Sequence, residues 1–286
     1  MYIRPRRTAA LLIMTTLALT ACSSPTQAAP PAPVATLTSL STPGSWTETF
    51  DHLDPARWIP SNWSGFWQQP GLTGTFQPDN AYVDGHGHLV LALKMQSCAT
   101  GLCAQAAELQ SAQRFGFGRY TYRMRAASTS ANPKKAGQVL PGNISGAFSY
   151  VDNSATEIDI EIEGNRPKTL NAAVWNGLTQ KSYAVLPTGT SLGQGFQTIS
   201  YEWRPDRITY FLNGTQVWET TQNIPQSPAF IMLNIWPTVS SAWGGLASPG
   251  SVYMLVDSVS FEPLPQGLSK NNEHSDSKVV PQDSVE

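Results

Sequence analysis

Residues 157–163 alternate strictly between acid and isoleucine: the stretch reads EIDIEIE, with carboxylates at Glu157, Asp159, Glu161 and Glu163. Successive side chains of a β-strand point to opposite faces, so the isoleucines predict a buried face and the acids a polar one. This pattern is typical of a strand that covers a core with one face only. The stretch therefore predicts a half-buried β-strand whose polar face carries four acids.

The sequence around this strand has the same period and many turn residues. Residues 88–93 (HLVLAL) and 119–125 (RYTYRMR) alternate, and residues 207–220 form two alternating runs around an Asn-Gly pair, the preferred pair for a type I′ hairpin turn. No long stretch keeps a helical period, and 22 glycines with 22 prolines disfavour helices. We therefore predict a single all-β domain over residues 45–265, a sandwich of two antiparallel sheets.

The beginning of the chain predicts export and a lipid anchor. Arg4, Arg6 and Arg7 precede an apolar run over residues 9–19, which is short for a bilayer span and typical of a secretory signal. The following Leu-Thr-Ala-Cys22 resembles a bacterial lipobox, in which the cysteine is lipidated and becomes the mature N-terminus. We predict an exported bacterial lipoprotein of the cell envelope, facing the periplasm or the exterior; the alternative is an ordinary secreted protein.

Composition predicts the remaining boundaries. With residues 1–21 as the signal peptide, residues 22–44 are rich in Pro, Ser, Thr and Ala and predict an extended tether. Residues 266–286 are polar, lack aromatics and predict a disordered tail. Without the signal peptide, 15 basic residues face 20 acidic ones, so the charge does not indicate a nucleic-acid partner. Membrane attachment would come from the lipid alone, and we expect a monomer.

The three cysteines predict one disulfide. Their number is odd for an exported protein, and a lipid on Cys22 leaves Cys98 and Cys103 as a pair. An oxidising compartment favours a disulfide that closes the small loop between them. A CxxxxC metal site is the alternative, but no histidine lies near it in the sequence.

The acidic strand also predicts a catalytic function for its carboxyl groups. Like charges aligned on one face destabilise a sheet, so four acids in one strand indicate a functional role. Glycoside hydrolysis uses two carboxyl groups at the scissile bond, one as nucleophile or base and the other as proton donor. Glu157 and Glu161 on a curved strand would supply this pair, and crowding by Asp159 would help to separate their pKa values. A calcium site built from aligned carboxylates and a solvated strand face are the alternatives.

The stretch EIDIE (157–161) resembles the signature of glycoside hydrolase family 16, the family of lichenases, laminarinases, agarases and plant xyloglucan endotransglycosylases. The resemblance continues in the family's order through FDHLDPARW (50–58), AELQSAQRFGFGRYTYRMR (107–125) and IPQSPAFIMLNIWP (224–237), and covers most of residues 45–262. It implies a concanavalin A-like jelly roll of two curved antiparallel sheets, with the acidic strand in the concave cleft. It also implies retention of configuration through a glycosyl-enzyme intermediate.

The resemblance implies roles for individual residues. Glu157 corresponds to the nucleophile, Glu161 to the general acid/base, and Asp159 to the residue that assists and orients the nucleophile. Asp257 resembles the side-chain ligand of a structural calcium ion on the convex side; catalysis itself needs no cofactor. Trp175, in VWNG, is a ring at a predicted strand end and suits stacking on a sugar. Seven other positions match substrate-contacting residues of the family: Glu108, Gln110, Phe148, Tyr150, Asn234, Trp236 and Trp243.

Departures from the family pattern bear on the substrate. Gln110 stands where lichenases usually carry arginine and is similar to the plant transglycosylases. No extra residue splits the motif, whereas laminarinases and agarases typically have ExDxxE, so the motif favours the lichenase and transglycosylase side of the family. Glu163 stands where lichenases usually have leucine, and the family pattern gives it no role.

These observations predict a retaining, endo-acting hydrolase of a β-glucan-type polysaccharide. One alternative is a transglycosylase that remodels an envelope or matrix glycan, with the same intermediate intercepted by a sugar hydroxyl. Another is a lectin-like glycan-binding lipoprotein, although a binder has no need for three crowded acids. A Ser-His-Asp hydrolase finds little support, because the chain has only four histidines, one of them in the predicted disordered tail.

Overall fold

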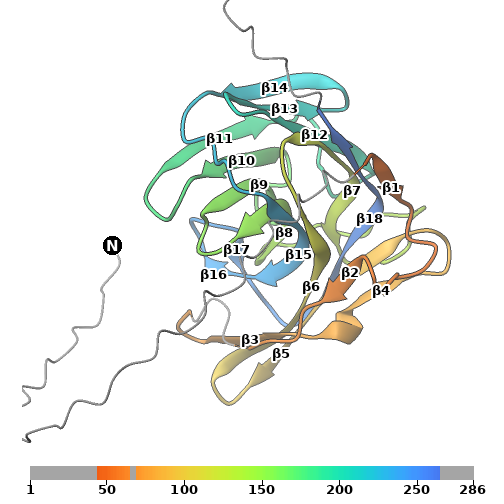
Figure 1. Cartoon of the computed structure of the whole chain (residues 1–286). Helices are drawn as coiled ribbons and strands as arrows, with labels where there is room; N and C mark the ends of the chain where they lie inside the picture. The colour runs from red at the N-terminus through yellow and green to blue at the C-terminus, as the bar shows by residue number, and fades with distance from the viewer. Residues whose placement is uncertain (1–43, 65–68, 265–286) are drawn as a thin grey trace, which may run out of the picture. The chain divides into compact units, whose positions relative to one another are not determined.

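A computed structural model describes residues 44–64 and 69–264 of the chain (Figure 1). In these two ranges the one helical element is the short 3-10 helix η1 (Pro78–Asn80), so the all-β prediction is confirmed. No helix of the described residues is long and apolar enough to cross a membrane. The predicted signal peptide, Cys22, the tail and almost all of the tether lie outside the described residues, and their boundaries stay predictions.

The first of two sheets carries the acidic strand. Its neighbouring strands pair antiparallel, and the acidic strand β9 is bonded on both edges, which holds its register firmly. From one end to the other the sheet contains β11 (Lys181–Pro187), β10 (Thr169–Trp175), β9 (Thr156–Glu163), β8 (Asn143–Val151), β15 (Ala229–Pro237), the second half of β6 (Gly101–Phe115) and β2 (Trp58–Pro60).

The second sheet carries the last strand of the described residues in its middle. It runs from the first half of β6 through β5 (Leu89–Cys98), β18 (Gly250–Pro263), β7 (Gly118–Ser128), β12 (Gln197–Trp203) and β13 (Ile208–Leu212) to β14 (Thr215–Thr220). Shorter strands flank it: β3 (Leu72–Phe76) pairs with β6, β4 (Ala81–Val83) with β5 and β1 (Trp46–Glu48) with β18. The β3–β6 pair is parallel, an exception to the predicted antiparallel pairing. A separate ribbon of β16 (Val239–Ser240) and β17 (Gly245–Leu246) follows β15.

Strand β6 belongs to both sheets and joins them (Figure 1). Its residues 101–105 pair with β5, and its residues 107–110 pair with β15. The change of partner falls at Ala106 and Ala107, which are both fully buried. Two successive side chains that point inward are the mark of a local irregularity that bends a strand. One strand thereby turns from one layer into the other.

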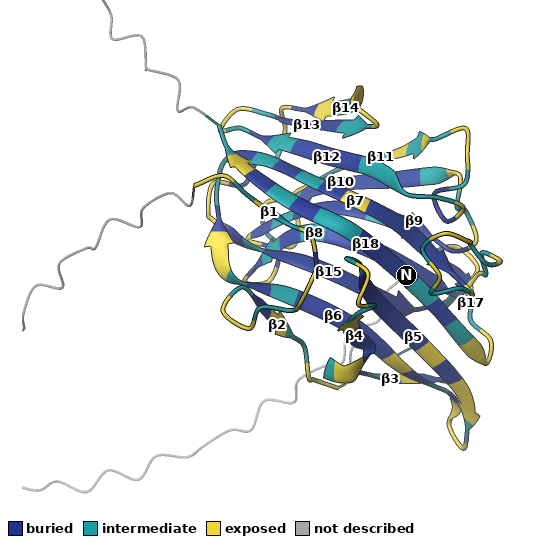
Figure 2. Cartoon of the chain, turned by 90° about the vertical axis from the view of Figure 1, so that its right-hand side faces the viewer, coloured by how far each residue is buried: buried dark blue, intermediate teal, exposed yellow. Residues whose placement is uncertain are grey.

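The core between the sheets combines aliphatic and aromatic side chains. Buried positions run along the middle of the strands, whereas exposed positions gather in the loops and at many of the strand ends (Figure 2). The isoleucines of β9 belong to the same buried cluster as the rings of Tyr201 and Tyr210. The Tyr201 hydroxyl shares a hydrogen bond of 2.6 Å with Ser149, and the Tyr210 hydroxyl donates to the Ala173 carbonyl at 2.9 Å. Because buried hydroxyls need partners, these bonds fix how the sheets face each other.

Two local predictions are confirmed. The hairpin of β13 and β14 turns at Asn213 and Gly214, whose φ angles of 50° and 82° both lie in the left-handed region that a type I′ turn requires. Cys98 and Cys103 form the expected disulfide at the turn between β5 and β6. The tight turn and the short covalent loop each fix a hairpin at the rim of the second sheet.

Candidate active site

Three acids of β9 form the floor of a hollow of about 520 Å³. Asp159 is 5% exposed, and Glu157 and Glu161 are half-buried, whereas the isoleucines between them lie in the core. The predicted division of this strand into a buried and a polar face is therefore present. The other lining residues come from both neighbouring sides: Trp63, Phe76, Glu108, Gln110, Phe148, Tyr150, Met232, Asn234 and Trp236.

The strand register explains why rings flank the acids. On β8, Tyr150 lies directly opposite Glu157, and Phe148 lies opposite Asp159. On β10, Trp175 lies opposite Glu157. Directly opposed residues of neighbouring strands share a face of the sheet, so these side chains stand on the same surface as the acids. The acids are thus placed between aromatic side chains of two adjacent strands.

All predicted catalytic and substrate-binding residues except Trp175 and Trp243 line the hollow. Trp63, Phe76 and Met232 also line it and were not predicted. Trp63 had a usable signal, because it lies in a tryptophan-rich segment beside glycine and proline. Phe76 and Met232 are apolar residues of strands, which a sequence does not distinguish from the core.

Glu108 holds one wall of the hollow together. Its Oε1 accepts hydrogen bonds from the Ser61 hydroxyl at 2.8 Å and from Trp63 Nε1 at 3.3 Å. Its Oε2 accepts a bond from Asn234 Nδ2 at 3.2 Å. The Oδ1 of the same Asn234 is buried and has no hydrogen-bond partner among the described residues. An unmade bond of this kind costs about 1–3 kcal/mol, so Asn234 suits a bound molecule that offers a hydroxyl donor.

The two tryptophans outside the hollow have other contacts. Trp175 Nε1 donates a hydrogen bond to Asp159 Oδ2 at 3.2 Å, a contact that the stacking prediction did not include. Trp243 lies in the turn between β16 and β17 and packs against the core. Trp175 therefore binds Asp159 directly. Contacts of Trp175 and Trp243 with a sugar stay predictions.

Burial raises the pKa of all three acids. It raises the pKa of Glu161 to about 8, and the charge of Glu157 adds to the rise. Burial, followed by the charges of Glu157 and Glu161, holds the pKa of Asp159 well above its usual range. Burial also raises the pKa of Glu157, opposed by a Ser154 hydrogen bond, by the charge of Lys181 and by a hydrogen bond with Asp159. Burial is therefore the largest cause for each acid, and Asp159, the predicted source of crowding, lowers the pKa of Glu157 through a hydrogen bond.

Glu163 faces the same side as the other acids but is fully buried in a set of bonds. Arg166 Nη2 forms an ion pair with its Oε1, and Asn171 Nδ2 donates to the same oxygen at 3.0 Å. The backbone N–H of Gly244 donates to Oε2 at 2.8 Å. Tyr183 in turn donates its hydroxyl to Asn171 Oδ1 at 3.2 Å. Glu163 thus ties the β16–β17 turn to the acidic strand.

The predicted calcium ligand Asp257 has basic neighbours. Its Oδ2 lies 3.1 Å from Arg123 Nε, and its Oδ1 lies 3.7 Å from His88 Nε2. Among the described residues no group of three His, Cys, Asp or Glu side chains could hold a metal ion. The expected calcium site at Asp257 stays a prediction.

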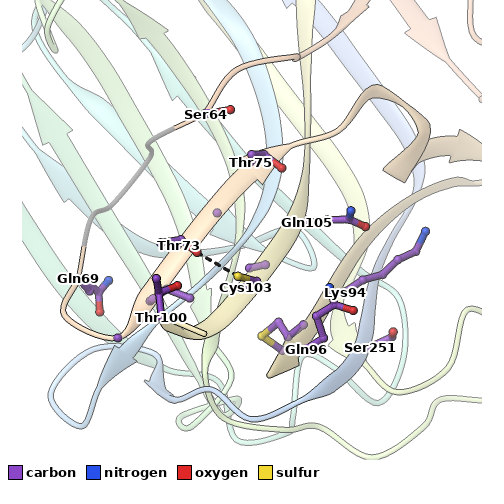
Figure 3. A pocket seen from close by; sticks show the side chains of 15 residues that line it. Ser64, Gln69, Thr73, Thr75, Lys94, Gln96, Thr100, Cys103, Gln105 and Ser251 are labelled. Carbon is purple, nitrogen blue, oxygen red and sulfur yellow. Dashed lines mark hydrogen bonds between the residues drawn. The ribbon is translucent and has the colours of Figure 1, made fainter. Parts of the chain in front are cut away.

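A larger hollow of about 900 Å³ lies beside the disulfide (Figure 3). Its floor comes from neighbouring strands: Thr73 and Thr75 of β3, Gln105 of β6, and Lys94 and Gln96 of β5. The described residues that line it include no acid and no aromatic ring. Among the described residues the acids and the rings together line the smaller hollow, which is the candidate active site.

Comparison with known proteins agrees with this assignment. The family model named glycosyl hydrolases family 16 matches the sequence over residues 69–247, more than half of the chain. A β-glucanase from Brevibacillus brevis is 28% identical over 227 residues, which cover 76% of this chain and 81% of that protein. A β-glucanase from Acetivibrio thermocellus is 27% identical over 208 residues, 71% of this chain, and the match spans 56% of that protein's length.

Solved structures show the same fold. The Bacillus licheniformis β-glucanase superimposes with a TM-score of 0.67 at 22% identity, covering 78% of this chain and 100% of that one. A prokaryotic β-1,3-1,4-glucanase (lichenase) from a mouse hindgut metagenome gives 0.65 at 23% identity, covering 77% and 100%. The predicted jelly roll of two curved sheets is thereby confirmed. The chain belongs to glycosyl hydrolases family 16 and is a glycosidase.

Proposed function

We propose that this glycosidase cleaves a β-glucan-type polysaccharide within the chain and retains the configuration at the anomeric carbon. The observation that carries the proposal is the row of Glu157, Asp159 and Glu161 on the floor of a hollow walled by rings and amides. Similarity to the β-glucanases supports the glucan as substrate. The three acids suffice for the reaction without a cofactor.

The reaction has two displacements at one sugar carbon. Glu161 donates its proton to the glycosidic oxygen while the Glu157 carboxylate attacks the anomeric carbon, so the glycosidic bond breaks and a glycosyl-enzyme ester forms. Glu161, now ionised, takes a proton from water, and the water oxygen displaces Glu157. The high pKa of Asp159 supports a protonated side chain that donates to Glu157 and keeps the nucleophile ionised.

The walls of the hollow suit a polysaccharide. The faces of sugar rings are apolar, so they pack against aromatic side chains such as Phe148, Tyr150 and Trp236. Sugar hydroxyls need hydrogen-bond partners, and Asn234 Oδ1 is a buried acceptor without a hydrogen-bond donor among the described residues. An open hollow on a sheet admits a chain that continues on both sides, which supports internal cleavage.

The activity should depend on pH through the same acids. Glu161 must be protonated for the first step, so kcat/KM falls as the pH rises through about 8. Glu157 must be ionised, so kcat/KM also falls at low pH, and burial moves that limb above the usual range of a glutamate. Initial rates between pH 4 and 10 measure both limbs. An alkaline limb below pH 6 would contradict the assignment of Glu161.

A substrate screen tests the proposal. Barley β-glucan, laminarin, xyloglucan, agarose and carrageenan are incubated with the purified protein, and viscosity, reducing ends and product sizes are followed. We expect a rapid loss of viscosity on a β-glucan and, by NMR of the first products, a retained anomeric configuration. Inverted products, or release of only terminal sugars, would contradict the mechanism.

Transglycosylation is the second candidate, and one observation favours it. Tyr183 of β11 is 46% exposed and lies beyond the acids on the β10 side, where an acceptor sugar would have a ring to stack on. A sugar hydroxyl would then take the place of water in the second displacement. Products longer than the donor, detected by mass spectrometry, would identify this activity.

We also propose that the enzyme is an exported monomer held to the cell envelope by a lipid on Cys22. The arginines, apolar run and lipobox-like sequence that precede this cysteine support the proposal. Mass spectrometry of the mature N-terminal peptide would detect the lipid, and Cys22→Ser should release the enzyme from the membrane fraction.

A further inference from the structure

Lys181 lies in line with the candidate nucleophile. In the β9–β10 pair, Glu157 is directly opposite Trp175, and in the β10–β11 pair, Trp175 is directly opposite Lys181. Because opposed residues share a face, the three side chains form one row across three strands. Lys181 therefore stands at the same surface as the acids, two strands away from Glu157.

Two aromatic rings hold the ammonium group of Lys181. Its Nζ lies 4.3 Å from the centroid of the Trp175 ring and 4.6 Å from the centroid of the Tyr183 ring. Ammonium groups are attracted to the faces of aromatic rings at such distances. The same Trp175 donates its N–H to Asp159. The lysine thus packs on the tryptophan that binds the central acid.

The hairpin that carries Lys181 is fastened to the acidic strand. The backbone N–H of Gly177, in the β10–β11 turn, donates to the Ser154 carbonyl at 2.6 Å. Ser154 belongs to the turn just before β9, where Asp152, Asn153 and Ser154 all have positive φ angles of 41°, 53° and 61°. Left-handed conformations are unfavourable for such residues, so this turn has a shape imposed by its surroundings. The position of Lys181 relative to the acids is therefore fixed by the Gly177–Ser154 bond and by the contacts of its ammonium group with the two rings.

We propose that Lys181 is a positioning residue of the active site: its ammonium group, held between Trp175 and Tyr183, keeps Trp175 bonded to Asp159 and places a positive charge beside the three acids. The inference rests on the proposed function, since it assigns these acids to catalysis. Trp175 carries the contact with Asp159, and Lys181 does not line the hollow. Lysine serves this purpose because it presents a compact charge on a flexible apolar stem.

The charge of Lys181 opposes the effect of burial on each acid. It lowers the pKa of Glu157, Asp159 and Glu161, whereas burial raises all three. Without it, the nucleophile would hold its proton more tightly, and the proton donor would release its proton less readily. The lysine thus keeps the three acids within a usable pH range.

Several other charged and titratable groups around the acids have hydrogen-bond or ion-pair partners of their own. On the β8 and β6 sides, Tyr150 and Glu108 face the hollow, and Glu108 is held by Ser61, Trp63 and Asn234. At the far end of β9, Glu163 is paired with Arg166. Behind the sheet, Tyr210 of β13 bonds to the Ala173 carbonyl, and on β11 Tyr183 bonds to Asn171. Of the two cations named here, Arg166 is paired with Glu163, and Lys181 lies in the row of Glu157.

The pH profile of kcat/KM tests the proposal on the best substrate of the screen. In Lys181→Met, both limbs should move to higher pH by about half a unit, and Lys181→Arg should restore the limbs of the wild type. Added salt should reduce the difference between the limbs of the wild type and those of Lys181→Met, because salt screens the charge of Lys181. Lys168→Met, at the other end of β10, removes the same charge and should leave the profile unchanged.

Two results would overturn the proposal: a Lys181→Met profile that superimposes on that of the wild type, or a Lys181→Arg profile shifted as far as that of Lys181→Met. A titration of ¹³C-labelled Asp and Glu carboxyl carbons by NMR gives a reading without turnover. If the protein cleaves no glycan, the proposed function fails, while this titration still shows whether Lys181 acts on the acids. Unchanged titration curves in Lys181→Met would then refute the role of the lysine by themselves.

Discussion

Replacing Glu157 by alanine should lower kcat on the order of 10⁴-fold or more, because the variant lacks the oxygen that forms the glycosyl-enzyme bond. Azide fills the space left by the carboxylate, so it should restore turnover of an aryl glycoside with a good leaving group. Azide then attacks the anomeric carbon in a single displacement, and the glycosyl azide has the inverted configuration. NMR of that product measures the stereochemistry directly.

Glu161→Ala provides the matched comparison. The first displacement still proceeds with a good leaving group, since such a group departs without a proton. Azide then attacks the glycosyl-enzyme from the water side, so the product has the retained configuration. The two variants should thus give opposite anomers from one substrate. The same anomer from both, or wild-type rates in Glu157→Ala, would refute the assignment of these two roles.

A change in stability accompanies the loss of activity at Glu161. The folded protein raises the pKa of this carboxyl from the ordinary 4.5 to about 8, so the folded state binds its proton more tightly than the unfolded chain. The free energy of unfolding therefore falls as the pH rises between these two values. Glu161→Gln removes the titration. Its melting temperature should equal that of the wild type near pH 4 and exceed it at pH 7.

Glu163→Ala should lower the free energy of unfolding by about 2–4 kcal/mol, the largest loss that we expect from one acid of the strand. The substitution leaves the Gly244 N–H without its buried acceptor and removes the ion partner of Arg166. It also frees Asn171, which bonds to the same carboxylate. Urea denaturation at pH 7 measures the loss.

Two controls separate burial from charge in this prediction. Glu163→Gln keeps an oxygen acceptor and should lose less stability than Glu163→Ala. Asp206→Ala breaks the surface pair of Asp206 and Arg207, whose atoms lie 2.9 Å apart, and should change the free energy of unfolding by about 0.5 kcal/mol or less. Equal effects of Glu163→Ala and Asp206→Ala would show that the Glu163 bonds contribute little.

The acidic strand was predictable because its information is local. Alternation with isoleucine determines which face is buried, and the neighbours on β8 supply rings that the family resemblance had already indicated. The hairpin at Asn213 and Gly214 was predictable for the same reason, since two adjacent residues decide the turn. Cys98 and Cys103 are close in sequence, which limited their possible partners.

The roles of Glu163 and Lys181 could not be predicted from local patterns. Glu163 looks like its neighbours in the sequence, but in the structure it is buried by its bonds with Arg166, Asn171 and Gly244. Lys181 acts through the register of β10 and β11, which depends on where the intervening turn closes. Such contacts join segments that are separated by turns and loops. Local sequence patterns therefore do not show which of their side chains meet.

The place of β18 has a consequence for how the chain folds. This last strand lies between β5 and β7 and also pairs with β1, so that Trp46 stands opposite Phe261. Until residues 250–263 have been synthesised, β5 and β7 each present an open edge to solvent, the kind of edge that aggregates. Contacts so distant in sequence form slowly, since a long loop must close first. The hollow thus acquires its final shape only after residues 250–263 have joined the sheet, and a chain that stops before β18 should not mature into an enzyme.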